Sequence, residues 1–265
     1  MTTAPDHVRL PDLRLDLGCG GSKKAGCIGL DSVAAPGVDH VIDLTHERWP
    51  FADESVEYAF SSHFFEHIPE PNHVFMELGR VARNGARFEF WTPYTFTEEG
   101  FFYGHVAHFS ERLWLEFCFY HRDAFVPLLG GRWLLHAVTY IVPDPTVQSI
   151  RQQGFSLNFA IRHFKDVAIE FGVEIEFRRE LELPAVLPQR YYAPNREAPR
   201  SLLAAEPQPM APSSTSDLQA MVRQLETTIE QKNSHIRQLE QLIGRLEAGR
   251  VMRLLRWAGQ RRSRS

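Results

Sequence analysis

The chain has 265 residues, of which 43% are hydrophobic, and its formal net charge at pH 7 is −4. This apolar share excludes a wholly disordered or fibrous chain, and the length predicts one full domain with further segments. The charge is unevenly distributed, because residues 244–265 carry seven Arg and one Glu. The rest of the chain has 22 basic and 32 acidic groups, and this acidic body argues against nucleic-acid binding.

Five short strands are predicted in the first part of the chain, at residues 13–17, 27–31, 38–43, 55–62 and 87–91. Residues 72–81 have apolar side chains at helical spacing, and a turn at Asn84-Gly85 precedes the fifth strand. Further along, residues 158–171 predict a helix and residues 173–177 a closing strand. Strands that alternate with helices and loops predict an α/β fold with a doubly wound, mostly parallel, Rossmann-like sheet.

Composition divides the chain into four parts. Residues 1–183 contain the predicted sheet and form the expected globular domain. Residues 184–215 hold seven of the 17 prolines and no apolar period, which predicts a linker. A helical pattern follows over residues 216–249, and residues 250–265 form a basic end.

The cysteines and the hydropathy of the chain indicate where the protein works. Cys19, Cys27 and Cys118 are too few and too scattered for a disulfide framework, and they suit a reducing compartment. The N-terminal residues show no apolar run typical of a secretory signal, and no stretch reaches the roughly 18 apolar residues of a membrane span. We therefore expect a cytoplasmic protein that is able to lie against the inner face of a membrane.

A glycine loop follows the first predicted strand, in the run Asp16-Leu17-Gly18-Cys19-Gly20-Gly21. Glycines at this place let the backbone approach a ligand closely, because no Cβ intrudes. Asp31 ends the second strand, where a carboxylate accepts hydrogen bonds from ribose hydroxyls. Asp43-Leu44 ends the third strand and is placed to meet an adenine edge. The structural alternative is that Asp31 and Asp43 cap turns.

These motifs resemble class I S-adenosylmethionine-dependent methyltransferases, specifically the methyltransferase type 11 group. The resemblance covers about residues 10–110, and its motifs lie at residues 15–20, 29–31, 41–44, 49–56, 61–68 and 77–81. One departure is that only Ser22 to Ala25 separate the glycine loop from the second strand, so the first helix is missing or reduced to a turn. A dinucleotide site needs that helix to hold a pyrophosphate, whereas a sulfonium nucleoside has no phosphate.

The resemblance implies the cofactor S-adenosylmethionine and a set of binding residues. By this resemblance, Asp16, Gly18 and Gly20 would contact the methionine end of the cofactor, and Asp31 would bind its ribose. Asp43 and Leu44 would contact the adenine, and residues from Ser61 to His63 would line the floor of the site. Cys19 lies within the same loop, and we expect a small residue that fits there rather than a nucleophile.

Histidines at two predicted strand ends are candidates for catalysis. An alcohol acceptor must lose its proton, and an imidazole with an ordinary pKa near 6.5 is suited to remove it. The candidate bases are His105, His108 and His63. The pair Glu66-His67 is a habitual feature of the resembled group, and a structural role is as plausible for it as a functional one.

We expect no metal. The sequence contains no pairs of cysteines and no His-Glu-x-x-His motif, so zinc is unsupported. A hard cation held by scattered carboxylates remains an alternative.

The C-terminal part has a seven-residue repeat. Val222, Ile229, Ile236 and Ile243 occupy one heptad position, and leucines such as Leu225 lie three residues later. β-Branched residues and leucines in these positions favour a parallel two-stranded coiled coil, so we expect a homodimer through residues 218–249. The alternative is an amphipathic helix that folds back on the domain. The basic end, residues 250–265, has an apolar stripe opposite arginines, which is typical either of contact with an anionic membrane or of a solvated helix end.

This combination of a methyltransferase head, a rod and a basic end resembles bacterial enzymes that modify surface polysaccharides. We therefore expect O-methylation of a sugar hydroxyl on a glycan, with a histidine as general base. One alternative is a methyltransferase for a small secondary metabolite. The other is a non-catalytic scaffold that recruits partners through its coiled coil.

Overall fold

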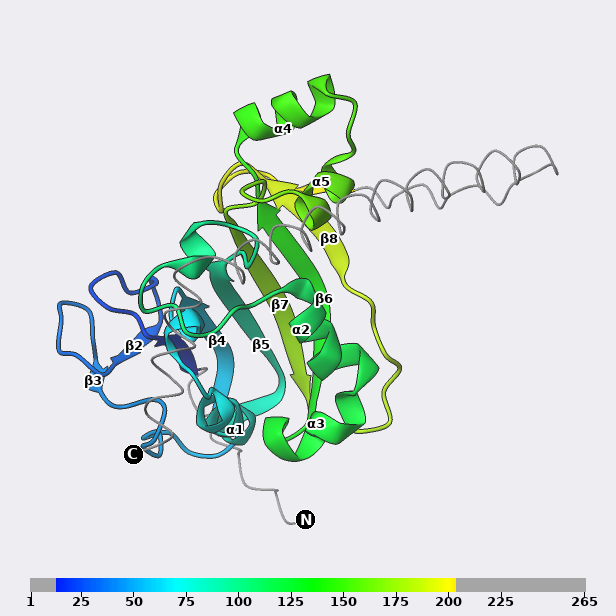
Figure 1. Cartoon of the computed structure of the whole chain (residues 1–265). Helices are drawn as coiled ribbons and strands as arrows, with labels where there is room; N and C mark the ends of the chain where they lie inside the picture. The colour runs from blue at the N-terminus through cyan, green and yellow to red at the C-terminus, as the bar shows by residue number, and fades with distance from the viewer. Residues whose placement is uncertain (1–12, 204–265) are drawn as a thin grey trace, which may run out of the picture. The chain divides into compact units, whose positions relative to one another are not determined.

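The computed structural model describes residues 13–203 of the chain (Figure 1). The strands of the described part are β1 (Leu13–Leu17), β2 (Ile28–Asp31), β3 (His40–Val41), β4 (Val56–Ser62), β5 (Ala82–Pro93), β6 (Arg132–Ile141), β7 (Glu170–Arg178), β8 (Gln189–Ala193) and β9 (Ser201–Leu202). The helices are α1 (Asn72–Val81), α2 (Glu111–Leu115), α3 (Arg122–Leu129), α4 (Asp144–Gln152) and α5 (Leu157–His163). Short 3-10 turns at Phe65–His67 and Glu99–Phe101 and a π-helical turn at Glu116–Tyr120 complete these elements.

The strands form one sheet in the order β3-β2-β1-β4-β5-β7-β6-β8-β9. Strands β1 to β5 are parallel, and β7 runs antiparallel between β5 and β6. The chain moves outward from β1 to β3 and then returns to place β4 on the other side of β1, which creates a switch point. Leu17 pairs with both Leu30 and Ser61, so the carboxyl ends of these three strands lie together, where open α/β sheets bind ligands.

The sheet and its helices share one main hydrophobic core. In β1, Leu15 and Leu17 point into this core and the intervening Asp16 points to the opposite face, as the alternation of a strand requires. Helix α1 covers the predicted residues 72–81 and packs Phe75 and Leu78 against the sheet. Its apolar spacing therefore predicted both its extent and its buried face.

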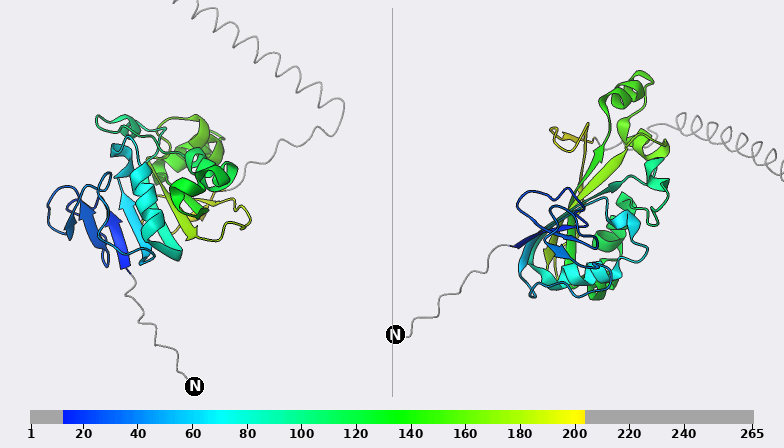
Figure 2. Two further views of the ribbon diagram at one scale, coloured as in Figure 1. Left: turned by 90° about the horizontal axis from the view of Figure 1, so that it is seen from below. Right: turned by 90° about the vertical axis from the view of Figure 1, so that its left-hand side faces the viewer.

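The helices cover one face of the sheet. All buried apolar residues of the five helices belong to the main core, whereas the opposite face carries a separate small cluster of Phe60, Trp91, Ile141 and Ala193, all from strands. The right-hand view of Figure 2 shows the helices to one side of the sheet. The predicted switch point is therefore present in the strand order, but the predicted doubly wound arrangement, which needs helices on both faces, is not found, because within residues 13–203 no helix covers the second face.

The predicted loss of the first helix explains part of this difference. Between β1 and β2 the chain forms a loop without a helix, as expected. The backbone N–H of Lys24 in this loop donates to Asp16 Oδ2 at 2.6 Å, and its ammonium lies 3.8 Å from the centroid of the Phe60 ring. The same ammonium donates to Glu89 Oε2 at 2.8 Å. A loop and one long side chain thus cover the part of the sheet where a helix is missing.

Two further predicted elements differ from the structure. Strand β5 begins at Ala82, and Asn84-Gly85 forms an irregularity within it rather than a separate turn, since the pairing with β4 shifts there. Helix α5 ends at His163 rather than at residue 171, because β7 begins at Glu170 and uses the following residues for strand pairing.

The linker that we predicted over residues 184–215 was wrong at its start. Strands β8 and β9 lie in this stretch, and β8 pairs in parallel with β6 from Ala137↔Gln189 to Ile141↔Ala193. Prolines next to these two short strands made the stretch resemble a linker in composition. The rest of the linker, the coiled coil at 216–249 and the basic end at 250–265 lie outside the described residues. In the described part, no helix is long and apolar enough to cross a membrane.

Candidate functional site

A cavity of about 380 Å³ lies at the carboxyl ends of the strands around the switch point. It is lined by Gly18, Asp31, Ser32, Asp43, Leu44, Thr45, His63, Phe64, His67 and Ile68. Five of these were predicted from the sequence as site residues: Gly18, Asp31, Asp43, Leu44 and His63. Of the others, Phe64, His67 and Ile68 lie in the motif at residues 61–68, whereas Ser32 and Thr45 were indicated only by their positions next to predicted residues.

The glycine loop presents its backbone to this cavity. Gly18 has a φ of 67°, and its N–H donates to Leu30 O at 2.8 Å, which ties the loop to β2. A Cβ at Gly18 would lie 2.3 Å from the ring of Phe64. Two features therefore require glycine at this position: the left-handed backbone conformation and the close packing of the Phe64 ring.

Asp31 lies at the end of β2 with both carboxylate oxygens hydrogen-bonded to backbone. Oδ2 accepts from the N–H of Gly20 at 2.9 Å, and Oδ1 accepts from the N–H of Val33 at 2.9 Å. Each carboxylate oxygen has two lone pairs, so each retains acceptor capacity toward a ligand. The same side chain thus fixes the glycine loop and offers acceptors for hydroxyl groups in the cavity.

Asp43 is used differently. Its Oδ1 accepts from the N–H and the hydroxyl of Thr45 at 2.9 and 2.5 Å, and its Oδ2 lies 3.1 Å from Nδ1 of His46. The hydrogen bonds from Thr45 lower the pKa of Asp43. The carboxylate thus caps its own turn, which is the structural alternative that the sequence left open. Asp43 and Leu44 contribute to the cavity wall, but the carboxylate of Asp43 is occupied within the loop.

Four predicted binding residues lie near the cavity but not among its lining residues. Asp16 is only 2% exposed, and burial raises its pKa. Burial also raises the pKa of Cys19 to about 11, so its thiol is neutral and is no nucleophile at neutral pH. Gly20 contacts Asp31 through its N–H, and Ser61 is fully buried beneath the floor. These residues shape the glycine loop and the layer beneath the cavity.

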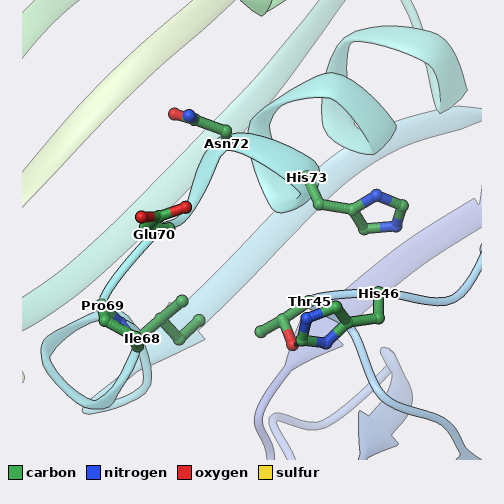
Figure 3. A pocket seen from close by; sticks show the side chains of 7 residues that line it. All are labelled: Thr45, His46, Ile68, Pro69, Glu70, Asn72 and His73. Atoms are coloured by element: carbon green, nitrogen blue, oxygen red, sulfur yellow. Dashed lines mark hydrogen bonds between the residues drawn. The ribbon is translucent and has the colours of Figure 1, made fainter.

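A second pocket of about 500 Å³ adjoins the cavity and shares Thr45 and Ile68 with it. In Figure 3, the side chains of His46 and His73 lie on its two sides, from the loop after β3 and from α1. Nε2 of His73 lies 2.8 Å from the carbonyl of Glu47, which fixes this imidazole against the loop. The space next to the Asp43–Thr45 wall is therefore open beyond the cavity itself.

His63 is held by two carboxylates. Its Nε2 lies 2.7 Å from Glu170 Oε1, and its Nδ1 lies 3.0 Å from Glu66 Oε1. Hydrogen bonds to Glu170 and then to Glu66 raise the pKa of His63 to about 9. The ring is therefore protonated at neutral pH and does not act as the base that we predicted. Its backbone has a φ of 54°, a left-handed conformation that is uncommon outside glycine and often marks a functional site.

The other two candidate bases have different surroundings. His105 lies against His67, a cavity residue, with ring centroids 4.8 Å apart, and Nδ1 of His105 is buried without a hydrogen-bond partner in the described part of the chain. His108 is exposed, and its ring packs on that of Phe101 at 5.0 Å. The structure thus brings His105, but not His108, into contact with the cavity wall.

Another pocket, of about 370 Å³, lies between the loop after β5, helices α2 and α5, and the end of β6. It is lined by Tyr94, Phe96, Ser110, Glu111, Arg112, Leu115, Tyr140 and Arg162. Tyr140 donates its hydroxyl to Glu111 Oε2 at 2.6 Å, and Arg190 lies 3.0 Å from the same oxygen. This pocket combines aromatic rings with charged groups that hydrogen-bond, and no sequence motif indicated it.

The chain was compared with known protein families, curated proteins and solved structures. Residues 15–90 match the family model described as a methyltransferase domain. No curated protein sequence matches the chain significantly.

Solved structures that are similar to the chain include three proteins. A SAM-dependent methyltransferase from Archaeoglobus fulgidus is 13% identical with a TM-score of 0.42, and the match covers 63% of this chain and 87% of that chain. The YcgJ protein from Bacillus subtilis is 15% identical with a TM-score of 0.41, and the match covers 65% of this chain and 94% of that chain. A geranyl diphosphate C-methyltransferase from Streptomyces coelicolor A3(2), solved with Mg²⁺, geranyl diphosphate and S-adenosyl-L-homocysteine, is 14% identical with a TM-score of 0.38, and the match covers 64% of this chain and 74% of that chain. At these low identities and scores, neither their acceptors nor their metals are transferred to this chain.

The strand order and the glycine loop fit a Rossmann-like methyltransferase fold, residues 15–90 match a methyltransferase domain, and the cofactor of such domains is S-adenosylmethionine. The residues present fit such a cofactor. The cavity has the size of a small-molecule site, a carboxylate that suits a ribose lies on its wall, and the Gly18 backbone lies open beside it.

Proposed function

We propose that the protein is an S-adenosylmethionine-dependent O-methyltransferase that acts on a sugar hydroxyl of a glycan. The observation that carries the proposal is a juxtaposition at the cavity. A wall with Asp31 and the Gly18 backbone, suited to a nucleoside, lies in the same cavity as His67, which contacts His105.

When bound, S-adenosylmethionine supplies a sulfonium methyl group. In the reaction that we propose, the C–O bond to the acceptor forms as the C–S bond breaks, and the proton of the acceptor hydroxyl must go to a base. The chain contributes chiefly by positioning, which is worth on the order of 10⁵ M or more in effective concentration. A positioned base adds roughly 10²–10⁴-fold.

Among the three predicted bases, the geometry favours His105. His63 is protonated between two carboxylates, and His108 is exposed on a neighbouring loop. His105 is half-buried, has an unpartnered Nδ1 in the described structure and lies beside His67. It is therefore the predicted base whose proton-accepting nitrogen is not already engaged.

The pocket between Tyr94, Arg112 and Arg162 supports an acceptor of the sugar class. Aromatic rings stack on the apolar faces of sugars, and charged side chains such as Glu111 hydrogen-bond to their hydroxyls. The coiled coil and the basic end predicted from the sequence add a membrane-proximal dimer to this proposal. A small secondary metabolite is the competing acceptor.

The proposal is tested with the purified full-length chain in two steps. Calorimetry should show one S-adenosylmethionine bound per chain, and the absence of binding contradicts any methyltransferase activity. Methyl transfer from labelled cofactor is then assayed against glycans, monosaccharides and small phenols. Labelled glycan supports the proposal, whereas transfer only to small phenols supports the competing acceptor.

The role of His105 is tested by His105→Ala. We expect turnover to fall about 100-fold or more with little change in the affinity for S-adenosylmethionine. His163→Ala, on the exposed end of α5, is the matched control and should retain wild-type turnover. Unchanged turnover in His105→Ala would remove this residue from catalysis.

A further inference from the structure

Glu66 is a buried carboxylate that lacks the partners such a group needs. The residue is 2% exposed, and its Oε1 lies 3.0 Å from Nδ1 of His63. Its Oε2 is buried and contacts no hydrogen-bond donor within residues 13–203. A buried charged oxygen without a donor costs several kcal/mol unless a cation or a ligand completes it. The carboxylate therefore points to a positive group that binds next to it.

Two imidazoles lie beside this carboxylate. One possible ligand atom from each of Glu66, His67 and His105 lies within 4.8 Å of the others. Nδ1 of His67 lies 3.2 Å from the carbonyl of Gly104, so a proton on this nitrogen is donated there and Nε2 keeps its lone pair. A hydrogen bond from one ring nitrogen to a carbonyl is the usual way in which proteins orient a histidine that binds a metal.

The third member, His105, offers a nitrogen that the protein itself does not use. Its Nδ1 is buried and has no hydrogen-bond partner among the described residues. Unpartnered buried nitrogens are rare, because an imidazole nitrogen in an apolar setting loses its hydration without compensation. Two of the three side chains thus present buried polar atoms that have no hydrogen-bond partner among residues 13–203.

The backbone holds the cluster together across a long separation in the sequence. The N–H groups of Val106 and Ala107 both donate to the carbonyl of Glu66, at 2.8 and 3.1 Å. The N–H of His105 donates to Phe102 O at 3.0 Å. These bonds fix the loop after β5 against the short turn after β4, so the three side chains are brought together by the fold rather than by a flexible loop.

We propose that Glu66, His67 and His105 bind one divalent transition-metal ion at the edge of the cofactor cavity. Two imidazoles and one carboxylate form a borderline donor set without thiolates, which suits Zn²⁺ and its first-row neighbours better than Mg²⁺ or Ca²⁺. Bonds of about 2.0–2.2 Å place donor atoms roughly 3.4 Å apart in a tetrahedral site, so the cluster contracts slightly when the ion binds. With three protein ligands, one position stays open, as in catalytic zinc sites.

The use of this ion rests on the proposed function. An acceptor hydroxyl at the open position would have its pKa lowered by the ion, so that it loses its proton more readily at neutral pH. His105 would then act as a ligand rather than as the free base, and the ion would carry the activation that we assigned to this imidazole. The binding of the metal itself does not depend on what is methylated.

Metal binding is tested on the full-length chain without an affinity tag, stripped with EDTA and dialysed, by calorimetric titration with ZnCl₂. We expect one tight site per chain, and an affinity about 100-fold lower or worse in both Glu66→Gln and His105→Ala. His163→Ala removes an exposed imidazole outside the cluster and should bind like the wild type. Wild-type affinity in the two cluster variants, or no tight site at all, would overturn the proposal.

Thermal melting separates loss of the site from loss of the fold. Zn²⁺ should raise the melting temperature of the wild type and of His163→Ala, but not that of Glu66→Gln. Without metal, Glu66→Gln should melt at or above the wild-type temperature, because glutamine removes a buried charge that is only half paired. A stabilisation by Zn²⁺ that persists in Glu66→Gln would contradict the assignment.

An assay of methyl transfer with and without EDTA distinguishes the two proposals. Tight binding of Zn²⁺ with EDTA-insensitive transfer confirms the site and refutes its role in activating the acceptor. EDTA-sensitive transfer that ZnCl₂ restores supports both. If Zn²⁺ binds tightly but no acceptor is methylated, the metal site is supported and the proposed methyl transfer is contradicted.

Discussion

Gly18 and Gly20 of the glycine loop experience different constraints, although both have positive φ. At Gly18 a Cβ would collide with the ring of Phe64, whereas at Gly20 nothing lies within 4 Å of the position of a Cβ. Gly18→Ala should therefore destabilise the fold by about 2–4 kcal/mol, from backbone strain and overpacking together. Gly20→Ala should cost only about 1–2 kcal/mol for the left-handed backbone.

Denaturant unfolding of both variants checks this prediction. Equal losses in the two variants would show that the Phe64 ring moves aside easily and that packing at Gly18 contributes little. Calorimetry with S-adenosylmethionine on the same samples should show the larger loss of affinity in Gly18→Ala, since this glycine lines the cavity.

The two strand-end carboxylates, Asp31 and Asp43, have different hydrogen-bond partners. Asp31→Asn should lower the affinity for S-adenosylmethionine about tenfold or more, because a charged acceptor for a ribose hydroxyl is lost. Asp43→Asn should change this affinity less than about threefold, because its carboxylate is already occupied by Thr45 and His46. Calorimetric titration of both variants measures the difference. A larger loss in Asp43→Asn would mean that this carboxylate leaves its turn when the cofactor binds.

Helix α1 is fixed to the preceding loop by a buried ion pair. Glu77 accepts from the N–H of Trp49 at 2.7 Å and from Nε and a terminal nitrogen of Arg80 at 2.8 and 2.6 Å. Burial opposes ionisation of Glu77, but the hydrogen bonds from Arg80 and Trp49 outweigh it and hold the pKa of Glu77 below its usual range. The helix therefore depends on this carboxylate being charged.

This interaction predicts an acid-sensitive stability. A carboxylate whose pKa is lower in the folded state stabilises fully above its unfolded pKa, and the stabilisation disappears as the pH falls through the folded pKa. Glu77→Gln should therefore lose about 1–3 kcal/mol of unfolding free energy at pH 7, and its difference from the wild type should shrink as the pH is lowered toward 3. Unfolding measured at several pH values tests this, with Glu70→Gln, exposed before α1, as the control. A difference that stays constant with pH would rule out charge as its origin.

The elements that the sequence predicted well are those with one buried face. The alternation around Asp16 and the spacing in α1 each reflect a single core. Strand β6 gave no such signal, because its residues are buried on both sides and a continuous apolar run does not distinguish strand from helix. Strand β8 escaped prediction because two tyrosines and prolines on either side resemble a loop.

The candidate site was predictable around the glycine loop and only partly around the histidines. Glycines and acids at strand ends have fixed places in the chain relative to a strand, so Gly18 and Asp31 were identified from order alone. Glu66 and His105 lie 39 residues apart, and no spacing rule joins them. Their contact depends on the two backbone hydrogen bonds from Val106 and Ala107 to Glu66, which only the fold reveals.

At the scale of the whole molecule, the head and the predicted coiled coil should separate in function. The described residues form one sheet with its own core, so deletion of residues 216–265 should leave turnover within about twofold of the wild type. The same deletion should convert a dimer to a monomer, because the heptad repeat is removed. Light scattering and a methyl-transfer assay on both proteins measure these effects. A truncated protein that remains dimeric would show that the head associates on its own.

Arg196, which lies between β8 and β9, connects the end of the described chain to the residues around the cavity. Its guanidinium donates to both carboxylate oxygens of Glu170 and, at 2.9 Å, to Ser62 Oγ, while Glu170 holds the cavity histidine His63. The segment around Arg196 is thus bonded to residues next to the cavity at the switch point. A recombinant head that ends at residue 183, the domain boundary predicted from composition, would lack Arg196 and its hydrogen bonds to Glu170. We expect the side chains of Glu170 and His63 to change conformation in such a protein. A partner or membrane that pulls on the C-terminal part would transmit its force to the same carboxylate.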